Sequence, residues 1–304
     1  MLTTAADHFA MHEAVPTDAS EVLEFINEVN QIADKSECDV YWRGQADYRC
    51  GGRSSLARLT ETPTAMRDVD LNRAEAELLV DAKRWITATT SPPLNDLEWL
   101  ALMQHNWIPT RLVDFTREPL IATFFAVESM DGVDGRLLAI ATPRSDPVVS
   151  DEEALGFQIS KVQLGKLRLW QPKPSLSPRL AAQNGVFALG RLPSTNPARH
   201  ARDDFLNRET LMSRDEIVSV FSIPLYLVSL SRGRNRRAGS TYPSCFTARI
   251  HVDKSSIRTQ LSKKSRTGSL RPAGDPIDHA SCYPDVEGLR RYSTTLARVQ
   301  RGLT

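Results

Sequence analysis

The stretch 104–126 (QHNWIPTRLVDFTREPLIATFFA) is the most tightly constrained part of the chain, because it contains two prolines, Pro109 and Pro119. Pro109 disfavours helical geometry at the residue before it, so a preceding helix must end there. Pro119 suits the first turn of a new helix, and the apolar residues after it recur at helical spacing. The residues between them alternate like a short strand. The stretch therefore predicts helix, turn, strand, turn and helix, and a site where its polar side chains gather at the two turns: Gln104, His105, Thr110, Arg111, Asp114, Thr116, Arg117 and Glu118.

The remaining chain contains further helical and strand patterns. The order is helices first and then many strands with few crossover helices, which predicts an α+β fold with N-terminal helices packed on a mixed, mostly antiparallel sheet. Residues 1–16 are expected to be a flexible lead-in and residues 17–304 a single domain. Residues 144–156 are expected to form a loop. Helices are expected at 18–34, 70–88, 95–105, 177–183, 255–264 and from 286, and strands at 39–43, 135–142, 162–172, 185–192, 215–224 and 246–252. Asn95 or Asp96 is expected to cap the helix that ends at 105.

Composition excludes several classes of protein. The chain of 304 residues carries 38 basic and 37 acidic residues, and its formal net charge of +1 gives no global attraction to nucleic acid or membrane. The four cysteines lie far apart, without a partner in zinc-site spacing, so we expect no metal and a reducing, cytoplasmic environment. No window approaches the ~18 consecutive apolar residues of a membrane span, and the N-terminus is not a secretory signal.

Several separated motifs together resemble the FRG domain family of bacterial and phage proteins, from about Val22 to Tyr292. The family is named after an aromatic-Arg-Gly motif, and 104–126 is similar to its second signature. A stretch near 225–240 departs from the family pattern and resembles a basic insertion. The other similar positions are Tyr41–Trp42–Arg43–Gly44–Gln45, then Arg179, Gln183, Gly185 and Phe187, and finally Tyr283–Pro284–Asp285 with Gly288.

The first two motifs are also similar to those of the ADP-ribosyltransferase superfamily. That resemblance implies its fold, NAD as a substrate, and a catalytic domain that transfers ADP-ribose to a nucleic acid or a protein. It also implies a toxin or phage-defence effector, with an antitoxin or another protein as partner. The implied catalytic residues are Arg43, Thr116 and Gln183. The implied NAD-binding residues are Arg43, Gln45, His105, Thr110, Arg111, Asp114, Thr116 and Phe125.

These residue types suit NAD chemistry. Cleavage of the nicotinamide glycosidic bond passes through an oxocarbenium-like centre, so the site needs a fixed cation near the phosphates and a polar group aligned with the ribose and the acceptor. Arginine suits the phosphates because its planar fork donates two hydrogen bonds. Gln183 and Glu287 are both candidates for the third group, and Glu287 also suits a helix start. Their position relative to Arg43 would decide between them.

Each of these residues also has a structural interpretation. Arg111 and Asp114 would pair with each other, or Arg43 would bridge to Asp114 and order the fold. His105 would form a hydrogen bond at a helix end, and Gln183 would satisfy buried backbone.

A rival function is a nucleic-acid- or nucleotide-binding module without chemistry. Its arginine-rich cleft would contact phosphates and would bind less tightly as salt is added. A regulatory partner subunit whose polar cluster is purely structural is a third possibility. The arginines of the rival surface are Arg43, Arg49, Arg53, Arg111 and those of the segment 232–237.

Overall fold

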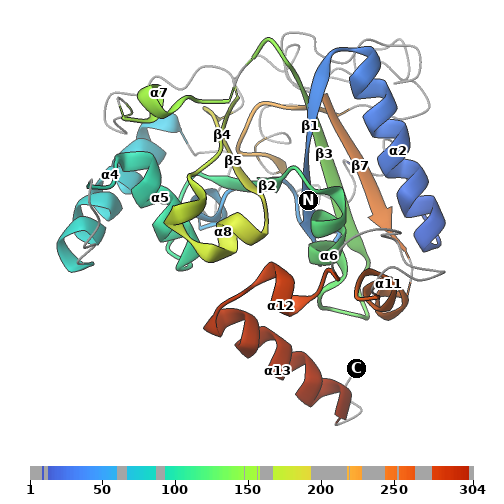
Figure 1. Cartoon of the computed structure of the whole chain (residues 1–304). Helices are drawn as coiled ribbons and strands as arrows, with labels where there is room; N and C mark the ends of the chain where they lie inside the picture. Colours follow the sequence, from blue (N-terminus) through green and yellow to red (C-terminus); the bar gives the residue numbers. More distant parts are fainter. Residues whose placement is uncertain are drawn as a thin grey trace, which may run out of the picture.

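The computed structural model describes residues 9, 13–59, 67–86, 93–146, 148–155, 157, 167–192, 218, 220–227, 244–251, 253–263 and 276–300. Seven strands of this part form one sheet in the order β4-β5-β2-β1-β3-β7-β6 (Figure 1). Neighbouring strands are antiparallel except for the parallel pair β6 and β7, so the predicted α+β class with a mostly antiparallel sheet is confirmed. The strands are β1 (Cys38–Gln45), β2 (Val113–Thr116), β3 (Gly135–Pro143), β4 (Arg168–Trp170), β5 (Gly185–Leu189), β6 (Tyr226–Leu227) and β7 (Ser244–Ile250).

The helices lie on different sides of the sheet (Figure 1). Helix α2 (Ala19–Lys35) flanks the sheet beside β7, and α4 (Asp68–Trp85) and α5 (Asp96–His105) gather near β4 and β5. Asn95 begins α5 with the predicted cap, because its side chain accepts from the Glu98 N–H and the Glu98 carboxylate accepts from the Asn95 N–H. The others are α3 (Ser55–Arg58), α6 (Pro119–Val127), α7 (Asp151–Leu155), η3 (Pro174–Leu176), α8 (Pro178–Ala182), α11 (Lys254–Leu261), α12 (His279–Cys282) and α13 (Val286–Gln300).

One face of the sheet packs against α2, α6 and α11. Strand β1 contributes Trp42 to this core, and α2 contributes Phe25, whose ring meets the Trp42 ring edge-on at 6.2 Å. Because side chains alternate along a strand, Arg43 points to the opposite face, which also carries Tyr41. The aromatic-Arg-Gly motif therefore divides its side chains between a buried core and the other face of the sheet.

Two sequence predictions are wrong. The segment 215–224 was predicted as a strand, but its described residues form only one isolated bridge, between Phe221 and Gly52. The described residues 218 and 220–224 are all buried rather than buried on alternate positions, because they cover a face of the sheet instead of extending the sheet. The loop predicted at 144–156 contains α7, whose start is stabilised by reciprocal bonds between Ser150 and Glu153.

Other described features concern the ends of the sheet and the helices. Ala14 pairs with Ala248 of β7, and Phe9 is fully buried. The four cysteines are free thiols. Among the described residues, no helix is both long and apolar enough to cross a membrane.

Gly44 fixes the distance between β1 and α6. A Cβ atom at this position would overlap with the Ala122 carbonyl oxygen and the Ala126 nitrogen, both of them backbone atoms of α6. Backbone cannot swing away as a flexible side chain can. The glycine of the aromatic-Arg-Gly motif therefore lets α6 lie directly against the strand that carries Arg43.

We expect Gly44→Ala to lower the free energy of unfolding by about 1–3 kcal/mol, because the added methyl group must displace α6 from β1. Urea unfolding would measure the change. Gly132→Ala is the matched control, since a Cβ there meets nothing within 4 Å. Equal stability of the two variants would contradict the close packing assigned to Gly44.

Candidate functional site

The neighbouring strands β1 and β2, near the centre of the sheet, stop pairing beside Arg43. The ladder between β1 and β2 contains a single residue pair, Trp42 with Thr116. Beyond this pair the Arg43 guanidinium bridges the strands, donating from Nη1 to the Asp114 carbonyl oxygen at 2.9 Å. The same nitrogen lies 3.6 Å from Asp114 Oδ2. The structural interpretation in which Arg43 bridges to Asp114 is thus confirmed, and this opening between β1 and β2 is the first part of the candidate site.

The site contains buried hydrogen-bonding atoms that have no partner among the residues that the structure describes. Arg43 has a side chain only 13% exposed, and its Nε donor is unpaired, as is the Oε1 acceptor of Gln45 two residues along β1. The Gln45 amide nitrogen donates to the Gly51 carbonyl oxygen at 2.8 Å. Burial lowers the pKa of Arg43, although the nearby Asp114 carboxylate opposes this shift. A donor and an acceptor left unpaired on one strand are unusual, because each such group costs about 1–3 kcal/mol.

Gln104 connects α5 to this opening. Its Oε1 accepts from the hydroxyls of Ser55 at 3.0 Å and Thr110 at 2.8 Å, and its Nε2 donates to Asp114 Oδ2 at 3.1 Å. The structure therefore brings Thr110 and Asp114 together with Arg43, through a residue that is among the polar side chains of 104–126 but not in the implied NAD-binding set. The signal was present, since Gln104 belongs to the Gln-His pair of the second motif. Ser55 had no sequence signal.

Arg111 does not pair with Asp114, so the predicted pairing is wrong. Its guanidinium instead forms a buried ion pair with Glu75 of α4, and its backbone N–H donates to Glu75 Oε1 at 2.7 Å. Nη2 donates to Asn72 Oδ1 at 2.6 Å. Burial raises the pKa of Glu75 despite the attraction of Arg111. Arg111 thus links the start of β2 to α4, because the buried carboxylate of Glu75 is a stronger partner than the half-exposed carboxylate of Asp114 on β2.

Thr116 and Gln183 are joined to each other. The Thr116 hydroxyl donates to the Gln183 carbonyl oxygen at 2.6 Å and accepts from the Glu118 N–H at 3.0 Å. The Gln183 amide donates to the Cys282 carbonyl oxygen at 3.0 Å, so this side chain satisfies buried backbone, one of the two predicted interpretations. Thr116 is 3% exposed, and its hydroxyl forms hydrogen bonds within the protein.

His105 belongs to a second polar cluster, which α8 and the start of α13 complete. Its Nε2 lies 3.0 Å from Ser177 Oγ and 4.0 Å from Asp285 Oδ2. Both oxygens approach the same ring nitrogen, so the ring cannot relay a proton between them as the histidine of a serine-protease triad does. Burial, and then the charge of Arg179, lower the pKa of His105 and favour its neutral form. The predicted hydrogen bond at a helix end is confirmed.

Asp285 holds this second cluster together. Its Oδ2 accepts from Arg179 Nη2 at 2.6 Å and Nε at 2.9 Å, while its Oδ1 accepts from the Gly288 N–H at 3.0 Å and caps α13. Burial alone would raise the pKa of Asp285, but these bonds outweigh it and leave the pKa lowered. A Cβ at Gly288 would overlap with the Tyr283 carbonyl oxygen. The aromatic-Pro-Asp…Gly motif is therefore a helix start anchored to α8.

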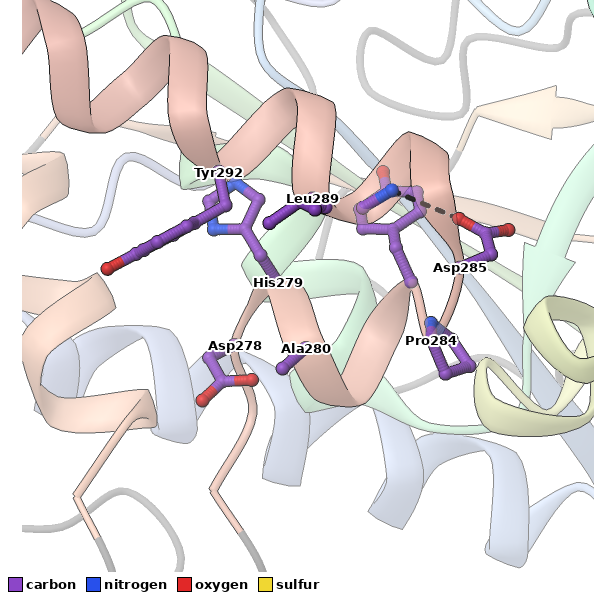
Figure 2. Close-up of a pocket in the computed structure, with 9 residues that line it drawn as sticks. Asp278, His279, Ala280, Pro284, Asp285, Leu289 and Tyr292 are labelled. Carbon is purple, nitrogen blue, oxygen red and sulfur yellow. Dashed lines mark hydrogen bonds between the residues drawn. The ribbon is translucent and has the colours of Figure 1, made fainter.

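A cavity of about 490 Å³ lies between α12 and α13. Figure 2 shows Pro284 and Asp285 at one end of this cavity and Asp278 and Tyr292 at the other. The His279 ring between them meets the Phe124 ring edge-on at 5.2 Å. The residues that line the cavity include neither Arg43 nor Gln45, so it adjoins the second cluster only.

The remaining predicted residues lie near α13. Phe125 packs against Tyr283, with 5.7 Å between ring centroids. Glu287 pairs with Arg290 and Arg291 of its own helix, and the bonds from Arg290 lower the pKa of Glu287 to about 2. In the described part of the chain, no hydrogen bond or ion pair joins Arg43 to Gln183 or to Glu287. The arginines predicted at 232–237 lie outside the described residues, as does most of the expected basic insertion.

We expect Glu75→Gln to lower the free energy of unfolding by about 3–5 kcal/mol, because the Arg111 charge would remain buried without its partner. Urea unfolding measures the loss. Asp70→Asn on the same helix, which breaks an exposed pair with Arg67, is the control and should cause no measurable change. Equal effects would show that Arg111 does not depend on Glu75.

The Asp285–Arg179 pair should give the stability of the protein a specific pH dependence. The folded-state pKa of Asp285 lies below its unfolded value of about 3.9, so the stabilisation is fully present above about pH 4 and is lost as the pH falls through the folded-state pKa. Asp285→Asn keeps the helix cap but loses the ion pair, and should cost about 1 kcal/mol at pH 7 after allowance for solvent screening.

Urea unfolding of the wild type and of Asp285→Asn at several pH values tests this expectation. The difference between the two proteins should shrink as the solution is acidified from about pH 7 to pH 3. Asn95→Ala, which removes the cap of α5 without changing a titratable side chain, is the control, and its effect on stability should show no such trend. A constant difference across the pH range would refute the contribution of the ion pair.

Part of the chain matches a known protein family. Residues 38–134 match the family model described as the FRG domain, and this range contains β1, the opening beside Arg43, and the whole of 104–126. The predicted resemblance to the FRG family is confirmed over these residues. Neither the curated proteins nor the solved structures gave a match. Among the described residues, no group of three or more His, Cys, Asp or Glu side chains is arranged to hold a metal ion.

Proposed function

With residues 38–134 matching the FRG domain, we propose that the chain is an NAD-dependent enzyme resembling the ADP-ribosyltransferases in fold and activity. It would transfer ADP-ribose from NAD to a nucleic acid or a protein in the cytoplasm, as a toxin or phage-defence effector. An antitoxin or another protein would be its partner. Nicotinamide leaves with the bonding electrons of the glycosidic bond, and the acceptor loses a proton as its new bond to the ribose forms.

The observation that carries this proposal is the pair of unpartnered buried atoms on β1. Arg43 Nε offers a donor and Gln45 Oε1 offers an acceptor, and neither has a hydrogen-bond partner in the structure. A ligand with a phosphate and adjacent ribose hydroxyls supplies both an acceptor and a donor. NAD has this combination at each of its two nucleotide halves.

The residues around Arg43 would have distinct roles. Arg43 would hold a phosphate or ribose oxygen through its free Nε while Nη1 keeps the bridge to Asp114. Asp114 has a side chain 54% exposed and would align the ribose hydroxyls or take the proton of the acceptor. Thr116 would position the Gln183 segment through its hydroxyl. Catalysis through Gln183 requires that its amide exchange the Cys282 carbonyl oxygen for the substrate.

The test is NAD binding by calorimetry and nicotinamide release from labelled NAD, with candidate RNA, DNA and protein acceptors. We expect Arg43→Ala to weaken NAD binding by at least about tenfold, because one charge-assisted bond is lost from a buried site. Arg49→Ala is the control, since that arginine is exposed and already paired with Asp47. The proposal would be refuted if the wild-type protein did not bind NAD and Arg43→Ala behaved like the wild type.

A non-catalytic module that binds nucleic acid would behave differently. Its binding to an oligonucleotide would weaken steeply with salt, in proportion to the number of phosphates contacted, and NAD would not be consumed. The site around Arg43 favours this rival only through its charge, because a phosphate backbone does not require the unpaired acceptor at Gln45 Oε1. Both readouts can be measured on the same preparation.

A further inference from the structure

Arg58 lies near two other arginines, Arg43 and Arg53, and among the described residues only Arg43 of these three is paired with a carboxylate, that of Asp114. We propose that Arg43, Arg53 and Arg58 form a binding site for the pyrophosphate group of a dinucleotide. The identity of that dinucleotide as NAD rests on the proposed function, whereas the anion site rests on the contacts described below. Arg53 and Arg58 come from the segment that follows β1, and the predicted NAD-binding set includes neither of them.

Hydrogen bonds bring the segment 50–58 to Arg43. Ser55 stands between the two arginines in sequence and donates to Gln104 Oε1, and Gln104 donates in turn to the carboxylate that faces Arg43. Arg58 Nη1 donates to the Arg53 carbonyl oxygen at 2.8 Å, which turns the Arg58 side chain back along the segment. Arg58 lies close enough for its charge to act on both Arg43 and Arg53, so it stands between the other two arginines.

The positive charge at this point exceeds the negative charge. Asp114 is the partner of Arg43, but neither Arg53 nor Arg58 has a carboxylate partner among the described residues. Burial, and then the neighbouring charge of Arg58, lower the pKa of Arg53. The charge of Arg58 also contributes to the lowered pKa of Arg43. Three guanidinium cations against one carboxylate leave a charge that the two negative charges of a diester pyrophosphate would neutralise.

Unpaired donors point to the same ligand. The Nε atoms of Arg43 and Arg53 are both buried and without a hydrogen-bond partner. The Nη2 of Arg53 is already used, because it donates to the Ala57 carbonyl oxygen. Each guanidinium is thus held by its terminal nitrogen and keeps its inner N–H free for a phosphate oxygen.

The segment that carries these arginines is fixed in place before any ligand arrives. Buried Arg136 donates to the Tyr48 carbonyl oxygen at 2.7 Å, and buried Lys254 donates to the Ala46 carbonyl oxygen at 2.6 Å. Ser222 Oγ accepts from the Ser54 N–H at 2.8 Å. A site held by such bonds loses little conformational entropy on binding, which favours affinity for a small anion.

Arg49 provides a matched comparison within the same segment. It is exposed like Arg58, but Asp47 neutralises it through a pair with 2.7 Å between Nη2 and Oδ2. Loss of Arg58 should therefore affect an anion strongly, while loss of Arg49 should not.

The experiment is calorimetric titration of the full chain with ADP-ribose, which carries the pyrophosphate but cannot release nicotinamide, and with adenosine, which carries no phosphate. We expect Arg58→Ala to weaken ADP-ribose binding about tenfold and to leave adenosine binding unchanged. Arg58→Lys should have a smaller effect, and Arg49→Ala should stay within about twofold of the wild type. Thermal unfolding of each variant confirms that the fold is retained, which the exposed position of Arg58 favours.

Several results would overturn the site. They are equal losses in Arg58→Ala and Arg49→Ala, no binding of ADP-ribose by the wild type, or a loss in Arg58→Ala confined to an oligonucleotide. The outcome is separable from that of the proposed function. ADP-ribose binding through Arg58 without NAD turnover would support the anion site and count against the transferase. NAD turnover with unchanged KM in Arg58→Ala would support the transferase and overturn the anion site.

Discussion

The bridge from Arg43 to Asp114 is the interaction on which the centre of this fold depends. Strands β1 and β2 are neighbours in the sheet, yet they share one residue pair, and a guanidinium takes the place of the backbone bonds that would continue their ladder. A sheet that opens between its central strands must satisfy the exposed backbone groups there. An arginine satisfies them with one nitrogen and keeps the rest of its fork for another partner. The stability of the sheet and the proposed ligand site would therefore depend on the same side chain.

The polar residues sort into two clusters with different physical characters. Around Arg43 the charges are unbalanced and some donors and acceptors lack partners. Around Asp285 the polar groups are paired. The Asp285 carboxylate accepts hydrogen bonds from Arg179 and from the start of α13, and His105 lies beside it. Unsatisfied groups cost stability and persist where a ligand completes them, whereas satisfied networks fix one structure. This contrast is the reason for assigning the ligand to the first cluster and the docking of α12 and α13 to the second.

Local sequence signals predicted the elements well where the signal is itself local. The prolines at 109 and 119, the cap at Asn95 and the helical spacing after Pro119 each act within a few residues, and the structure follows them. Long-range partners are a different matter. The choice of Glu75 over Asp114 by Arg111 depends on how α4 packs, and nothing near Arg111 in sequence encodes it. The same holds for Gln183, whose amide meets Cys282 only because α12 folds back onto α8.

The segment 46–58 shows why the remaining part of the site could not be predicted. In sequence it is a polar loop with glycines and arginines, the composition of an ordinary solvated connection. Its rigidity comes from Arg136 on β3, from Lys254 on α11 and from Ser222, all distant along the chain. A loop held in this way can keep like charges close together, because the cost of their repulsion is met by bonds elsewhere in the fold. Positive charges held together against their repulsion favour an anionic ligand. The pyrophosphate of a dinucleotide matches both the excess positive charge and the free inner N–H groups of Arg43 and Arg53.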